Sequence, residues 1–193
     1  MADVVPDSGP LTTAGAVKNY LGITTANDDP LIERLILSVS AWIKQFLNRD
    51  ILVGNYSERV DGTGTYMLQL TQYPVQAITS LTIGPPNASS PLVLVENVNY
   101  VFSRSGTIRL LNPSWFPRGV ANVAIEYRAG YTSVPGDIEQ AAIETVAWRY
   151  KEKSRIAEAT KSLGGSETIS FQTTDVPADV KTSLANWRRV API

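Results

Sequence analysis

The sequence has 193 residues and a formal net charge of −1, with 44% hydrophobic and 18% charged residues. These values are typical of a globular chain that forms one domain with an insertion, or two small domains. There is no cysteine and no histidine, which excludes disulfides, thiolate catalysis, Cys-ligated zinc and Ser-His-Asp chemistry. Two catalytic options survive, namely paired carboxylates and lysine or serine chemistry. Because the commonest general base and the commonest metal ligands are missing, we expect a protein that is not an enzyme and that has no metal site.

The N-terminal quarter of the sequence predicts an arm and two helices. Residues 1–10 are small, acidic and proline-bearing, without the features of a signal peptide, and are expected to form a flexible arm. A short helix follows, with a threonine pair as candidate N-cap and Gly22 as its C-terminal stop. Asp29 as N-cap and Pro30 at the first position start a second helix. Apolar residues spaced three and four apart predict that it runs to about Leu47.

After the second helix the pattern changes to that of short strands separated by turn residues. A hairpin is expected around Ser105 and Gly106, and a last strand over residues 122–128. Gly62-Thr63-Gly64-Thr65 suggests a phosphate loop at first sight, but it lacks the Gly-Lys-Ser/Thr ending, and a hairpin turn is favoured.

Helical periodicity returns at Val134 and continues into a charged stretch, with the break expected at Leu163-Gly164-Gly165. Residues 166–172 alternate polar and apolar side chains, which favours a lone strand or a surface loop. A proline-led amphipathic helix is expected over Pro177–Arg189.

Together these elements predict an α+β fold, in which helices from both ends of the chain form a small bundle and an antiparallel β block, a small sandwich or barrel, is inserted between them. The expected boundaries are an arm at 1–10, a helical bundle from 11–50, 129–161 and 175–193, an inserted β domain at 51–128, and a loop or strand for inter-subunit contact at 162–174.

Four local motifs, in this order, resemble the head-tail connector (adaptor) family of tailed bacteriophages, in particular larger members with a β insertion. The motifs are Val17-Lys18-Asn19-Tyr20-Leu21; Asn27-Asp28-Asp29 before a long amphipathic helix; Gly130-Tyr131 before Pro135, Ile138 and Ala141; and Pro177, Val180, Leu184, Trp187 and Arg188. The resemblance covers residues 11–50 and 128–190.

The resemblance implies a structural virion protein of the neck between head and tail, present in the host cytoplasm during assembly. Members form a ring, usually of twelve copies, beneath the portal, extend the DNA channel and present a platform to the stopper or tail. The resemblance also implies that the protein binds no cofactor and catalyses no reaction. The implied partners are other copies of the chain, the portal, a stopper or tail-side neck protein, and genomic DNA that passes without sequence specificity; no membrane is implied. Two alternatives stay open: a stopper or tail terminator, and a β-type binding module on a helical oligomerisation stalk.

Three sets of residues are candidates for these contacts. Portal binding is assigned to the C-terminal segment, while Trp187 packing only into its own bundle is the alternative; the residues are Trp187, Arg188, Arg189, Val190 and Ile193. Lining of a DNA channel is assigned to a basic stripe, with a solvated helix end balanced by glutamates as the alternative; the residues are Arg149, Lys151, Lys153, Arg155 and Lys161. Strand addition to a neighbouring subunit is assigned to Ile169 and Phe171, with a surface loop as the alternative.

Two further groups are weighed against simpler interpretations. Asp137, Glu139 and Glu144 could be an acid pair or a metal site, but we expect them not to converge on one helix face and to complement the helix dipole instead. Core packing is expected for Trp42 and Trp148.

Overall fold

The computed structural model describes residues 4–5, 9–111, 114–153, 160–163, 167–170, 176 and 178–189. The chain divides into two compact units. The β unit comprises Met1–Gly9 and Arg49–Ser133, and the helical unit comprises Pro10–Asn48 and Val134–Ile193. Within the described ranges, no helix has the length and apolarity needed to cross a membrane. Helices therefore come from both ends of the chain and strands mainly from its middle, which confirms the expected α+β class.

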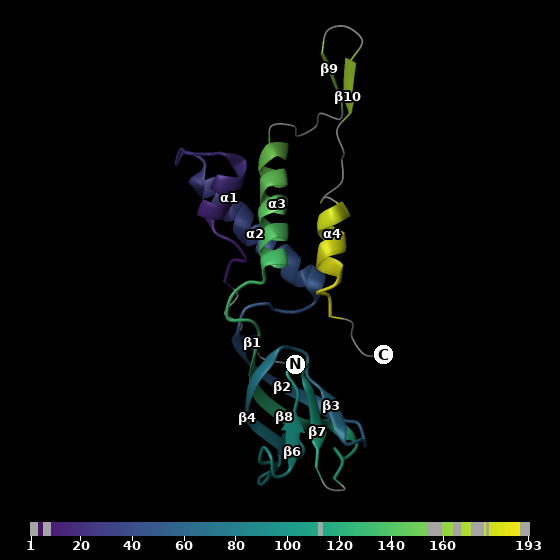
Figure 1. Ribbon diagram of the computed structural model, residues 1–193. Coiled ribbons are helices and arrows are strands. Elements are labelled where there is room, and N and C mark those ends of the chain that lie inside the picture. The colour runs from purple at the N-terminus through teal and green to yellow at the C-terminus, as the bar shows by residue number, and fades with distance from the viewer. Residues whose placement is uncertain are drawn as a thin grey trace. The chain divides into compact units, whose positions relative to one another are not determined.

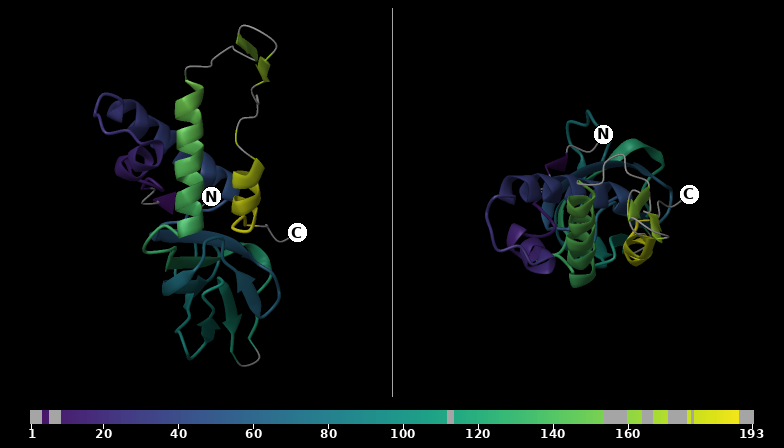
Figure 2. Two further views of the ribbon diagram at one scale, coloured as in Figure 1. Left: turned by 45° about the horizontal axis from the view of Figure 1, so that its top comes forward. Right: turned by 90° about the horizontal axis from the view of Figure 1, so that it is seen from above.

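The helical unit contains four helices: α1 (Ala14–Leu21), α2 (Asp29–Leu47), α3 (Gly136–Glu152) and α4 (Ala178–Ala185). Helix α3 contacts the other three and lies between α1 and α4 (Figure 2). Its buried side includes alanines, and short side chains let neighbouring helices approach closely. The long helix α2 buries one stripe of residues against them: Ile32, Ile36, Val39, Ser40, Ile43 and Leu47.

The helix ends follow the expected signals with one shift. Thr13 caps α1 by accepting a hydrogen bond from the Ala16 N–H (3.2 Å), and Gly22 ends the helix in the left-handed conformation. For α2, the N-cap is Asp28 and not Asp29, and neither aspartate caps the backbone with its side chain. The reason is that both carboxylates bind side chains of other helices.

The expected extent of the third helix is wrong. Helix α3 ends at Glu152, and Thr160–Leu163 forms strand β9, which pairs antiparallel with β10 (Glu167–Ser170). The expected lone strand is thus half of a hairpin. Two glycines stop a helix, but they favour a chain reversal between strands equally well, so the sequence pattern did not separate the two structures.

The β unit contains two antiparallel sheets (Figure 1). The first has the order β1-β2-β8-β4-β5, formed by Val4–Val5, Gly54–Gly62, Gly119–Ala129, Val75–Ile83 and Leu92–Val93. The second has the order β3-β7-β6, formed by Met67–Gln69, Thr107–Leu110 and Tyr100–Phe102. The expected hairpin around Ser105 and Gly106 and the expected last strand are both present.

Two expectations for this unit are corrected. The segment Gly62–Thr65 is not a hairpin turn, because β2 pairs with β1 and β8 whereas β3 pairs with β7. It carries the chain from one sheet to the other. In the N-terminal arm, Val4 and Val5 pair with β2, so that part of the arm is a strand and not flexible chain.

The core of the β unit is apolar, and two charged side chains, Arg49 and Glu58, are also buried in this unit. Alternate residues of β2 and β8 point inward, and Tyr56 and Tyr127 face each other with their ring centroids 5.6 Å apart. The Tyr127 hydroxyl and the Thr71 hydroxyl both donate to the carboxylate of buried Glu58. Burial raises the pKa of Tyr127 far above its ordinary value, so this hydroxyl stays a donor.

Candidate interaction surfaces

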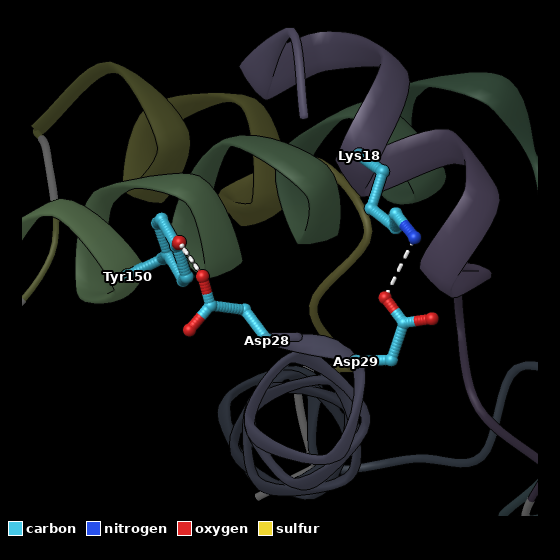
Figure 3. Close-up of polar contacts among 4 residues, drawn as sticks. All are labelled: Lys18, Asp28, Asp29 and Tyr150. Atoms are coloured by element: carbon cyan, nitrogen blue, oxygen red, sulfur yellow. Dashed lines mark hydrogen bonds and ion pairs between the residues drawn. The ribbon is translucent and has the colours of Figure 1, made fainter. Parts of the chain in front are cut away.

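An ion pair and a hydrogen bond join the helices of the helical unit that carry the candidate residues (Figure 3). Lys18 of α1 pairs with Asp29 at 2.7 Å, and the Asp28 carboxylate accepts a hydrogen bond from the Tyr150 hydroxyl of α3 at 2.6 Å. Lys153 also reaches Asp28, at 3.1 Å. The Tyr150 hydroxyl bond and the Lys153 bond lower the pKa of Asp28, which keeps it charged.

The described members of the basic stripe do not share one face. Arg149 donates to the Ser38 hydroxyl of α2 at 3.1 Å, and Lys153, one turn later, pairs with Asp28, which begins the same helix. Lys151 instead lines a hollow beside α4. Lys161 is a residue of β9, and Arg155 lies outside the described residues. Two of the five predicted cations are therefore engaged in holding α3 to α2.

The described part of the C-terminal segment packs against the end of α2. The Arg189 N–H donates to the Leu47 carbonyl at 2.9 Å, and the Arg188 guanidinium lies 5.7 Å from the centroid of the Phe46 ring. Trp187 is half-buried. Val190 and Ile193 lie outside the described residues. The first residues of the segment thus have a defined position at the end of α2, and Arg188 is exposed there.

A groove separates α3 from α4, and Trp187 stands at its rim. It has a volume of about 640 Å³ and is lined by Asp137, Ala141 and Glu144 of α3 and by Val180 of α4. A second hollow of about 280 Å³ shares Glu144 and Val180 with it and continues to the residues Tyr20, Trp148 and Lys151. The lining of the groove therefore mixes apolar residues such as Ala141 and Val180 with polar ones, including the carboxylates of Asp137 and Glu144.

This groove corrects one expectation in part, for two of the three carboxylates of α3. Asp137 and Glu144 are seven residues apart, which is about two helical turns, so they do lie on one face and line the same hollow. Glu139 is not among the lining residues. Among the described residues, no group of three or more acidic side chains could hold a metal ion. Glu144 instead accepts a hydrogen bond from the Gln140 amide at 2.8 Å.

The other predicted residues fall in different surroundings. Ile169 pairs with Lys161 across the β9–β10 hairpin, so its strand already has a partner within the chain. Phe171 lies outside the described residues. Trp42 is half-buried and stacks on Phe46 at 5.5 Å, and Trp148 is half-buried beside the groove, so neither is fully in the core.

Sequence reasoning missed a set of exposed apolar residues in the β unit. They follow strand β4, and four of them fall within seven positions: Leu92, Val93, Val95 and Val98. The available signal was the lack of any charged residue from Gly62 to Val95, which is unusual for a solvated surface. Hydrophobicity alone predicted that these residues belong to the core, because it does not show which side of a strand is covered by other residues.

Comparison with known proteins identifies one family from the sequence and one shared fold from the structure. The model of a family described as head completion protein matches residues 10–190. Among curated proteins, no sequence matches the chain.

Three solved structures share the fold over 100% of this chain and 97% of theirs. They are described as the neck of an empty GTA particle computed with C6 symmetry (16% identity, TM-score 0.65), the virion of a native gene transfer agent (GTA) particle (17%, 0.63), and the neck of a native GTA particle computed with C12 symmetry (18%, 0.60). At these identities the likeness is one of fold.

Proposed function

The chain belongs to the head completion protein family, and from that premise we propose that it is the adaptor of a phage neck, a ring that joins the portal to the stopper or tail. The observation that carries the proposal is the family match, which extends over residues 10–190 and so includes both units. The shared fold with chains described as neck components supports it. The C12 symmetry of one such neck is in keeping with a ring of twelve copies.

The C-terminal segment is the proposed portal contact. Arg188 is exposed, while Arg189 and Trp187 are partly covered and start the segment from a fixed position at the end of α2. Arginine and tryptophan are the residues that dominate interface energies most often. The segment that continues through Val190 and Ile193 supplies apolar side chains next to this cationic start.

For the DNA channel, the contacts of α3 favour a wall of mixed charge over a strongly basic one. Arg149 and Lys153 are held by α2, and Asp28 offsets the charge of Lys153. A lining that gripped phosphates tightly would slow the passage of DNA. Lys151 and Lys153 are the exposed members of the stripe whose side chains the structure describes, and Lys151 lies beside the α3–α4 groove.

The test is a pull-down of the full chain with the portal ring of its own phage. We expect binding by the unaltered chain and at least a tenfold loss with Arg188→Glu, because a desolvated arginine at an interface costs more than 1.4 kcal/mol to reverse. Arg34→Glu is the matched control: it makes the same charge change at an exposed position of α2 and should bind normally. Binding to the tail-side protein but not to the portal would contradict the adaptor and favour a stopper or tail terminator.

A further inference from the structure

Two groups of large apolar side chains stand exposed on the β unit. We call them the aliphatic patch, formed by Leu92, Val93, Val95 and Val98, and the aromatic patch, formed by Tyr66, Met67 and Trp115. Each of these side chains is between 43% and 67% exposed. Scattered apolar residues on a surface are ordinary, but clusters of this kind mark interaction sites.

The two patches lie at different edges of the β unit. The aliphatic patch follows edge strand β5 and the turn into β6, where the Val95 N–H donates to the Asn99 side chain at 2.9 Å. The aromatic patch lies at β3, where the Phe116 N–H donates to the Thr65 carbonyl at 2.8 Å and holds the Trp115 segment against that of Tyr66. In the three-stranded sheet, β3 and β6 are the two edges and β7 lies between them. The two patches are therefore separate surfaces of the β unit.

The charges around the two patches have opposite sign. Glu96 is the only carboxylate between Gly62 and Ile125, and it is exposed within the aliphatic patch. The same stretch holds three arginines, all exposed, and two of them adjoin the aromatic patch. The Arg109 guanidinium lies 5.5 Å from the centroid of the Tyr66 ring, and the Arg118 side chain packs against Gly64.

We propose that the two patches are the two halves of a head-to-tail contact between copies of this chain, with the aliphatic patch of one subunit packed on the aromatic patch of the next. The proposal rests on the ring assembly proposed above. A ring needs two different, complementary surfaces, because a patch that paired with itself would stop at a dimer. Apolar centres with charges at the rim are the usual composition of such contacts, and Glu96 facing Arg109 or Arg118 would fix their orientation.

The chain's own lack of cysteine gives a clean experiment. Val98→Cys and Trp115→Cys are placed together in one full-length chain, and separately in two others, and each protein is treated with a short bifunctional thiol reagent in the presence of the portal ring. Both positions are well exposed, so the substitutions should not disturb the fold. A pair of Val95→Cys and Tyr66→Cys repeats the test at a second place in the same patches.

The expected result is a ladder of covalent oligomers from the double variant, no product from either single variant, and dimers only from a mixture of the two single variants. A chain with Ser57→Cys, exposed on β2, and Trp115→Cys is the matched control and should give no ladder. Dimers from one single variant would overturn the head-to-tail arrangement, because they indicate a patch that pairs with itself.

The experiment gives one result if this inference is wrong and a different result if the adaptor function is wrong. If native mass measurement shows a ring on the portal while neither double variant gives a ladder, the contact is wrong and the ring stands. If the unaltered chain forms no ring on the portal, the proposed function fails and the contact fails with it.

Discussion

The two units of this protein use their apolar residues differently. The helical unit turns its apolar stripes toward its own helices, with Tyr20 and Leu37 as separate exposed residues, and adds side-chain contacts between helices, such as Asp28 to Tyr150. The β unit fills its core and still has apolar side chains exposed along two edges. The difference shows that the core of the β unit is complete without those exposed residues. Their side chains are therefore available to contact another molecule.

The largest expected effect tests whether the two units unfold independently of each other. Phe116→Ala removes a fully buried side chain from the core of the β unit, and should lower its free energy of unfolding by about 3–5 kcal/mol. Hydrogen exchange resolved by mass spectrometry should show faster exchange in β2, β4 and β8, with α2 and α3 little changed. Equal acceleration in α2 and α3 would show that the units unfold as one, against the comparison.

A smaller effect is expected at the polar contact inside the β unit. Tyr127→Phe removes a hydroxyl that donates to the buried Glu58 carboxylate, and should cost about 1–3 kcal/mol because that carboxylate loses a partner. Denaturant unfolding measures the loss. Tyr20→Phe, which removes the hydroxyl of an exposed tyrosine of α1, is the control and should leave stability unchanged.

The ties of the helical unit predict a weaker effect that depends on pH. The pKa of Asp28 is lowered in the folded chain by Tyr150 and Lys153, so the stability it contributes is present above the ordinary pKa of an aspartate. That contribution is lost as pH falls through the lowered pKa. Asp28→Asn should therefore reduce the loss of stability on acidification, measured as melting temperature between neutral and acid pH. An unchanged acid dependence would contradict this role.

The smallest effect on the fold is expected at the aliphatic patch. Val98→Ser should change the free energy of unfolding by no more than about 0.5 kcal/mol, because its side chain is exposed and away from the core. The same variant should weaken ring formation, as measured by native mass at falling concentration. A destabilised monomer would mean that the residue supports the β unit itself, and that the contrast between the two units is overstated.

The helices were predictable because their signals are local. Thr13 and Gly22 bound α1 as expected, and the apolar spacing of α2 gave its length to Leu47. The candidate residues were less predictable. Periodicity indicates that Arg149 and Lys153 share a face, but only the position of α2 decides that they bind Ser38 and Asp28.

The sequence alone did not predict which strands belong to the same sheet, because strand pairing joins residues that are far apart in the chain. The run Gly62–Thr65 looks like a hairpin turn in one dimension, yet Gly62 pairs with Gly119, across more than fifty positions. Similarly, the strand pattern of residues 51–128 indicated a β block, and not which apolar residues its two sheets would leave outside.

The sequence by itself determined the class of fold, the ends of α1, the C-terminal end of α2, and the exclusion of histidine and cysteine chemistry, because composition and helix caps are properties of single residues and near neighbours. Only the tertiary structure decided that Asp28 ties α2 to α3, that Thr160–Leu163 is a strand, and that Val98 is exposed. The physical reason is that burial and pairing depend on what lies opposite a residue in space, and in this chain that residue is often from the other end.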